Sequence, residues 1–127
     1  DRDPEAVAAL SGVPGIVARA ADLEGGPWPY EREHFAGIVV CNYLHRPLFP
    51  RLLAALEETG VLIYETFAAG NERFGRPGNP DFLLRRGELL ETVRGKLGVV
   101  AFEEGLVTAP KTAVVQRICA VRMNHDR

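Results

Sequence analysis

The sequence is poor in the residues that most often carry covalent or metal chemistry. Its 127 residues include a single serine, Ser11, and two cysteines, Cys41 and Cys119. Ser11 stands at the end of a predicted helix, which excludes the serine turn between strand and helix that hydrolases use. The cysteines and the three histidines lack the short spacing of zinc ligands, so we expect no metal site.

The chain also lacks the patterns of nucleic-acid and membrane binding. Its net charge is −2, with acidic and basic residues interspersed, and we expect no nucleic-acid surface. No apolar run approaches the length needed to cross a bilayer, and the opening Asp-Arg-Asp-Pro is not a signal peptide. Both cysteines lie in apolar runs, which favours reduced thiols in a cytoplasmic protein. The length fits one domain.

Helical and strand patterns alternate along the chain. Asp3 is expected to cap a helix that begins at Pro4 and ends at Gly12. Amphipathic spacing predicts further helices over residues 47–59 and 86–96. Short apolar runs predict strands over residues 16–21, 36–41, 61–67, 99–103 and 113–123, and residues 68–84 are expected to form a long irregular connection.

The apolar run from Phe35 to Cys41 stops abruptly at Asn42. A continuous run of this kind is typical of a strand covered on both faces, as in a parallel sheet. Strands that alternate with helices predict an α/β fold with a mostly parallel sheet. The last two strands are joined by a turn near Pro110, so we expect one antiparallel strand near the edge.

Polar residues follow two of these strands where a parallel sheet places its ligands, beyond the carboxyl ends. Cys41 and His45 are close enough in sequence to suggest a thiol nucleophile. That interpretation is disfavoured, because a thiol inside a buried strand behaves as a small apolar group.

Four motifs resemble those of one group of enzymes. They are Asn42-Tyr-Leu-His-Arg-Pro47, Tyr64-Glu-Thr-Phe67, the segment from Phe74 to Leu84, and Val115-Gln-Arg-Ile-Cys-Ala120. With the order of elements, they resemble the class I S-adenosylmethionine-dependent methyltransferases, in particular the small bacterial group related to tellurite-resistance methyltransferases. The resemblance covers nearly the whole chain. It implies a Rossmann-like sheet, S-adenosylmethionine as the cofactor and a small-molecule methyl acceptor.

One feature of that family is missing from the sequence. The family begins with a strand and a Gly-x-Gly-x-Gly loop, which lets the backbone approach the methionine part of the cofactor, and these 127 residues contain no such motif. The resemblance therefore implies a sheet that lacks its first strand and a fragment that is inactive by itself. An unfilled gap in the sheet favours a homodimer.

The resemblance also implies a set of cofactor ligands. Asp1 would bind the ribose hydroxyls, unless it is only a solvated terminus. Asp22 would accept a hydrogen bond from the adenine amino group and the backbone of Leu23 would donate to the ring, whereas the alternative for Asp22 is a turn aspartate. Asn42 completes this set.

The catalytic and acceptor-binding candidates follow the strands. Asn42 is a candidate to orient the acceptor with Tyr43. His45 is a candidate base, because the pKa of histidine lies near neutrality, and the alternative is that His45 only begins a helix. Long irregular connections often cover a ligand, but glycines and prolines here can equally shape a turn. Arg46 binds an anionic acceptor or pairs with Glu65. The acceptor-binding candidates are Tyr43, Arg46, Glu65, Phe74, Arg76 and Asn79.

A second hypothesis comes from a different functional class. In it, the chain is a non-catalytic Rossmann-like module that binds a partner or a nucleotide, or that dimerises, without transferring a methyl group. A glycine-rich strand and loop encoded upstream of Asp1 would favour the enzyme over this module.

Overall fold

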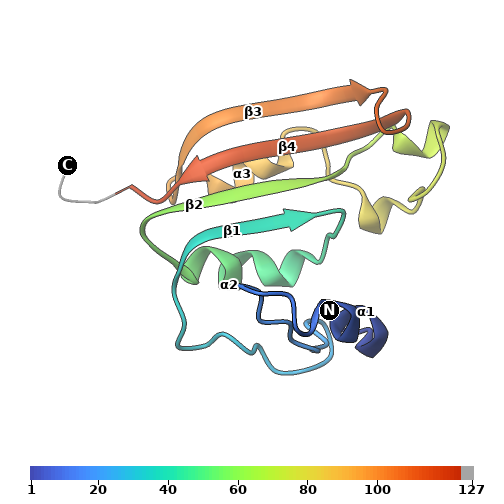
Figure 1. Cartoon of the computed structure of the whole chain (residues 1–127). Helices are drawn as coiled ribbons and strands as arrows, with labels where there is room; N and C mark the ends of the chain where they lie inside the picture. The colour runs from blue at the N-terminus through green and yellow to red at the C-terminus, as the bar shows by residue number, and fades with distance from the viewer. Residues whose placement is uncertain (124–127) are drawn as a thin grey trace. The chain divides into compact units, whose positions relative to one another are not determined.

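The computed structural model describes residues 1–123, and the chain divides into two compact units, Asp1–Arg32 and Glu33–Arg127. The first unit contains helix α1 (Pro4–Leu10), and the second contains a four-stranded sheet with the other helices (Figure 1). Each unit is described by itself.

The start of α1 confirms the predicted cap. The Asp3 carboxylate accepts a hydrogen bond from the backbone N–H of Glu5 at 3.0 Å, and Pro4 occupies the first turn. The predicted strand over residues 16–21 is wrong. A strand needs a row of backbone partners, whereas the backbone bonds of this segment are scattered. The N–H of Ile16 donates to the carbonyl of Val13 in a turn, the amino group of Asp1 donates to the carbonyl of Arg19, and the carbonyl of Asp1 accepts from Ala21.

The second unit alternates strands and short helices. The strands are β1 (Phe35–Cys41), β2 (Leu56–Phe67), β3 (Gly98–Val107) and β4 (Ala113–Val121). The helices are η1 (Arg46–Leu48), α2 (Phe49–Ala54), η2 (Asn71–Arg73), η3 (Pro80–Phe82) and α3 (Glu88–Val93), where η marks a 3₁₀ turn. Within residues 1–123, no helix has the length and the apolar character that crossing a membrane requires.

The sheet is mixed, so the predicted mostly parallel, Rossmann-like sheet is wrong. The strand order is β1-β2-β4-β3, and only β1 and β2 pair in parallel. The predicted antiparallel pairing of the last two strands is confirmed. The antiparallel strand β4 lies between β2 and β3, one strand in from the edge, and runs antiparallel to both. One reversed strand inside the sheet therefore makes two of its three interfaces antiparallel.

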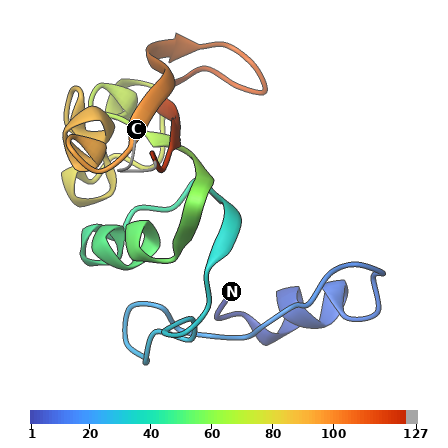
Figure 2. The ribbon, with the colours of Figure 1, turned by 90° about the vertical axis from the view of Figure 1, so that its left-hand side faces the viewer.

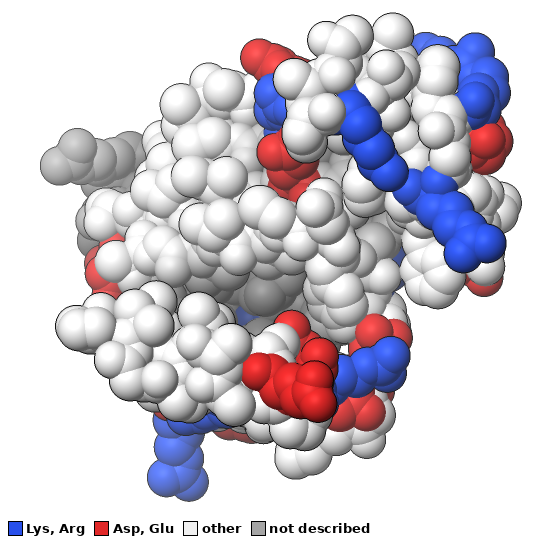
Figure 3. All heavy atoms as spheres, turned by 45° about the vertical axis from the view of Figure 1, so that its right-hand side comes forward, with Lys and Arg blue, Asp and Glu red and all other residues white. Residues whose placement is uncertain are grey.

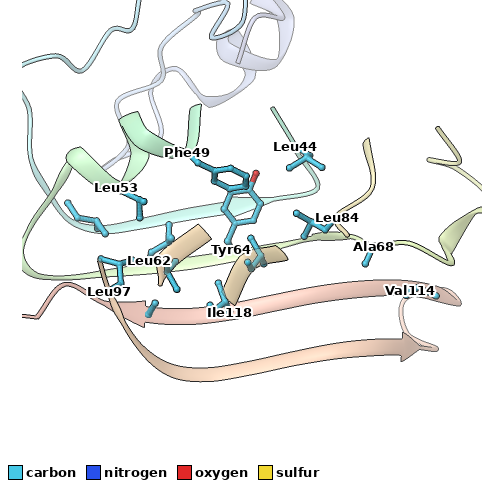
Figure 4. Packing of buried hydrophobic residues seen from close by; sticks show 14 residues of the cluster. Leu44, Phe49, Leu53, Leu62, Tyr64, Ala68, Leu84, Leu97, Val114 and Ile118 are labelled. Carbon is cyan, nitrogen blue, oxygen red and sulfur yellow. The ribbon is translucent and has the colours of Figure 1, made fainter. Parts of the chain in front are cut away.

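Both α2 and α3 lie on one side of the sheet (Figure 2). The buried cluster fills the space between the helices and that face, and it includes Leu53, Leu62, Tyr64 and Ile118 (Figure 4). Side chains alternate along a strand, and Val39 and Ile63 on the other face are 66% and 44% exposed. The prediction that these apolar runs are covered on both faces is therefore wrong within the described residues.

The same alternation corrects the prediction for one cysteine. Cys41 was expected inside a buried strand, but it is exposed, whereas Cys119 is half-buried.

Tertiary pairing shortens the helices relative to their sequence patterns. The predicted helix over residues 47–59 ends at Ala54, and β2 already begins at Leu56. The end of β4 draws these residues into the sheet: Arg122 exchanges backbone hydrogen bonds with Thr59 and Gly60. Similarly, α3 covers only Glu88–Val93 of the helix predicted over residues 86–96. Such contacts override helix propensity, which is weak for each residue.

The one-sided sheet predicts opposite outcomes for two neighbouring residues. Leu62→Ala should lower the free energy of unfolding by about 3 kcal/mol, because it leaves a cavity under the helices. Ile63→Ala should cost less than about 1 kcal/mol, because that side chain faces outward. Urea denaturation monitored by circular dichroism measures both values. Equal losses for the two variants would mean that the second face is also covered.

Candidate functional site

The carboxyl ends of β1 and β2 meet at one edge of the sheet. Cys41 is in register with Glu65, and the backbone N–H of Asn42 donates to the carbonyl of Glu65 at 2.9 Å. Asn42 then takes a left-handed conformation with φ 55°, which asparagine tolerates better than most residues. The chain therefore turns sharply at Asn42, and two of the predicted site residues, Asn42 and Glu65, lie side by side.

Arg46 belongs to an internal network. Its Nε and Nη2 donate to the two carboxylate oxygens of Glu88 at 2.7 and 2.9 Å. Its Nη1 and Nη2 also donate to the carbonyl oxygens of Asp81 and Leu83 at 3.2 and 2.8 Å. Arg46 was predicted to bind an anionic acceptor or to pair with Glu65. The structure instead gives it a bidentate partner, Glu88, that the sequence analysis did not identify.

The environment of Glu88 favours its charged form. Burial raises the pKa of Glu88, but hydrogen bonds from Arg46 and from the backbone N–H of Arg85 outweigh burial and hold it below the ordinary value. The hydrogen bond to Glu88 raises the pKa of Arg46, although burial opposes this effect. Both partners are therefore charged across the neutral range, as a buried ion pair must be to offset its loss of hydration.

Glu65 is paired across the sheet. Its carboxylate accepts from Nη2 of Arg117 at 2.9 Å, and Nη1 of Arg117 reaches Glu103 at 3.3 Å. These three residues form a row across β2, β4 and β3 on the open face. Because their side chains are at least a third exposed, the pairs contribute little to stability. They do fix the direction of the Glu65 carboxylate.

A tyrosine of β2 holds the residues that follow Asn42 in place. The Tyr64 hydroxyl donates to the carbonyl oxygen of Tyr43. Burial raises the pKa of Tyr64, so the phenol stays neutral. His45 is half-buried and precedes η1, where its carbonyl accepts from the backbone N–H of Leu48 at 3.0 Å. Tyr43 and His45 thus follow Asn42 on a turn whose position is fixed by Tyr64.

The connection after β2 is pinned by a buried asparagine. Asn71, which is 2% exposed, donates from Nδ2 to the carbonyl of Pro77 and accepts at Oδ1 from the backbone N–H of Val114, both at 3.0 Å. The sequence does not reveal that Asn71 links these two segments, since an asparagine in a loop rich in glycine resembles a surface turn residue. The connection is therefore an ordered part of the edge.

Two of the acceptor-binding candidates line one cavity. Arg76 and Asn79, together with Phe82, border a cavity of about 490 Å³ in this connection. Asn79 also caps η3, because its Oδ1 accepts from the backbone N–H of Asp81 at 2.9 Å. Phe74 does not join them and lines a separate cavity.

The remaining cofactor candidates lie in the first unit. The carbonyl of Asp1 accepts from the backbone N–H of Ala21 at 2.8 Å, which brings Asp1 close to Asp22. Asp22 Oδ1 accepts from the N–H groups of Glu24 and Gly25, both at 3.0 Å. The predicted turn aspartate is therefore present, and Leu23, half-buried, lies within that turn.

The described residues form no cluster of metal ligands. Within residues 1–123, no group of three or more histidine, cysteine, aspartate or glutamate side chains is arranged to hold a metal ion.

The Arg46–Glu88 pair predicts a specific sensitivity to acid. Glu88 binds its proton less tightly in the folded chain than in the unfolded chain, so the free energy of unfolding should fall as the pH drops below about 4.5. Glu88→Gln should cost about 2 kcal/mol at neutral pH and should weaken this dependence. Chemical denaturation at a series of pH values measures both effects.

Glu91→Gln is the matched control, because Glu91 is 64% exposed in the same helix and pairs with Arg94 on the surface. A Glu88→Gln variant whose acid sensitivity equals that of the wild type and of Glu91→Gln would contradict the assignment.

Comparisons with known proteins add no family assignment to this geometry. No protein-family model matches the chain. No curated protein matches it either.

Proposed function

We propose that this chain takes part in methyl transfer from S-adenosylmethionine to a small-molecule acceptor. The observation that carries the proposal is the meeting of Asn42 and Glu65 at the carboxyl ends of the parallel pair β1 and β2, within motifs that resemble those of the methyltransferases. Functional groups beyond the carboxyl ends of parallel strands are well placed to bind a ligand. Because one fold serves many reactions, the proposal rests on these groups and not on the sheet.

The hydrogen-bonding groups of the first unit suit a nucleoside. Asp1 and Asp22 are exposed and lie near each other, and carboxylates accept hydrogen bonds from hydroxyl and amino groups. In this proposal, Asp1 accepts from the ribose and Asp22 from the adenine, while the backbone of Leu23 donates to the ring. No residue of this chain is assigned to the methionine half, because the sequence has no Gly-x-Gly-x-Gly loop.

The second unit supplies the acceptor side. When bound, the cofactor supplies an electrophilic methyl group on a sulfonium. Asn42 and Tyr43 orient the acceptor, and His45 takes the proton that the acceptor loses. The cavity bordered by Arg76, Asn79 and Phe82 follows β2. An acceptor seated there would have a guanidinium, an amide and an aromatic ring within reach.

Calorimetry with S-adenosylhomocysteine tests the proposal on this chain and on any longer natural chain that includes it. Binding is expected, and binding by none of these chains would refute the proposal. In the chain that binds, Asp22→Ala should weaken binding about tenfold, the loss of one hydrogen bond to a charged group. Asp3→Ala is the control, because the Asp3 carboxylate caps α1 and is assigned no ligand. Equal affinities for these two variants would remove Asp22 from the site.

Asn42 allows the backbone role to be separated from the amide. Asn42→Ala should lower stability by about 1 kcal/mol, because alanine resists the left-handed conformation. Asn42→Gly keeps that conformation and removes only the amide. If the amide binds the ligand, both variants lose affinity. If only Asn42→Ala does, Asn42 is a structural turn residue.

The open face of the sheet favours a second candidate, a module that dimerises without catalysis. Val39, Ile63, Cys119 and Ala101 are in register across all four strands, and two of them are large, exposed apolar side chains. Contiguous exposed apolar patches mark interaction surfaces.

Sedimentation equilibrium tests the dimer. A dimer that Val39→Lys dissociates, without changing the monomer's circular dichroism, would support this candidate. A monomer at all concentrations would refute it. Ala36→Lys, at an exposed position near the start of the same strand, is the control for added charge.

A further inference from the structure

A second cavity lies beyond the carboxyl ends of β2 and β3. It has a volume of about 610 Å³, within the range of small-molecule sites. Its lining comes from four segments of the chain: Ala69 with Arg73 and Phe74 around the η2 turn, Arg86 before α3, Glu104 to Leu106 near the end of β3, and Val114 near the start of β4. None of these residues except Phe74 belongs to the methyl-transfer site proposed above.

The cavity carries two arginines without an ion pair. Among the described residues, no carboxylate lies within salt-bridge distance of Arg73 or Arg86. Arg73 is held in place, because its Nε donates to the carbonyl of Gly70 at 3.3 Å and its guanidinium lies 5.5 Å from the centre of the Phe74 ring. Figure 3 brings forward the right-hand side of the molecule in Figure 1, and Lys and Arg side chains lie at its upper right.

The only acidic residue of the lining is anchored by the protein. Glu104 Oε1 accepts from the backbone N–H of Gly87 at 2.8 Å and from Nε2 of Gln116 at 3.2 Å. Two guanidinium charges and this one carboxylate leave the lining with a net charge of +1. This net positive charge favours an anionic ligand over a neutral one.

The rest of the lining is apolar and open. Phe74 and Leu106 are 42% and 59% exposed. An apolar group can therefore contact Phe74 and Leu106, while its anionic end faces the arginines.

We propose that the cavity bounded by Arg73, Phe74, Arg86 and Leu106 binds a small amphipathic carboxylate. Arg73 and Arg86 bind the carboxylate, since guanidinium groups match its geometry with paired hydrogen bonds. Phe74 and Leu106 cover the apolar body. The site follows from the contacts of this cavity and does not depend on methyl transfer.

NMR titration with 1-naphthoate tests the site directly. The probe should shift the amide signals of Phe74, Gly105 and Leu106 and the side-chain Nε–H signals of both arginines. The neutral analogue 1-naphthalenemethanol should bind about tenfold more weakly, because it lacks the charge-assisted hydrogen bonds. Inorganic phosphate should also bind more weakly than 1-naphthoate, because it has no apolar body to contact Phe74 and Leu106. Equal affinity for the acid and the alcohol, or tighter binding of phosphate, would overturn the proposal.

Variants separate the site from nonspecific attraction. Arg73→Gln and Arg86→Gln should each weaken 1-naphthoate binding about tenfold. Arg94→Gln is the matched control, since Arg94 is exposed directly after α3 and pairs with Glu91 outside the cavity. It should bind as the wild type does. An equal loss in all three variants would indicate attraction by net charge alone and would overturn the site.

Glu104→Gln provides a gain that misfolding cannot imitate. Glutamine keeps the Oε1 acceptor for Gly87 and Gln116 but removes the negative charge beside the arginines. The variant should bind 1-naphthoate about threefold more tightly, the effect of one like charge removed at an exposed site. Unchanged or weaker binding would mean that the carboxylate of 1-naphthoate binds elsewhere and would overturn the proposal.

Discussion

The ion pair between Arg46 and Glu88 positions most of the edge that carries the candidate site. Arg46 follows β1 and Glu88 begins α3, 42 residues later. Between them, Arg46 also holds the carbonyls of Asp81 and Leu83 at the end of η3. A buried pair of this kind adds little net stability, because desolvation offsets most of its attraction. Its effect here is geometric, since one guanidinium sets where three separate segments meet.

Two buried amides complete this arrangement. Asn71 joins the connection after β2 to the start of β4. Gln116, which is fully buried, accepts from the backbone of Leu89 at 2.7 Å and donates to the carbonyl of Arg85 at 3.0 Å. A long connection without regular structure must find partners for its backbone polar groups, and these side chains supply them. The cavities on both sides of the connection are therefore largely preformed, which lowers the entropy lost on binding.

Local patterns predicted the elements better than their partners. The apolar run ending at Asn42 identified β1, and the cap at Asp3 identified α1, because both signals are contained in neighbouring residues. A run of apolar residues does not show how many faces of a sheet are covered, and so the exposure of Val39 was missed. The order of the strands was missed as well, because a reversed last strand can add to an edge or insert between two others.

In the candidate site too, the placement of neighbouring strand ends was predictable and the partners distant in sequence were not. Asn42 and Glu65 lie together because the carboxyl ends of parallel neighbours meet at one edge, which the sequence does predict. The partner of Arg46 was not predictable in this way. Glu88 follows a pair of arginines in an amphipathic segment and resembles any solvated helix residue. Its role depends on a fold that returns α3 to the end of β1.

The insertion of β4 also constrains how the chain acquires its structure. Strands β1 and β2 pair with each other early in the sequence, but β3 has no strand partner except β4. During synthesis, β3 therefore emerges from the ribosome with both edges unpaired, and β2 keeps one open edge, until residues 113–121 follow. Unpaired edges of this kind associate readily with other chains. The last strand thus acts as a closing element, and the interval before it is made is when this protein is most exposed to misassembly.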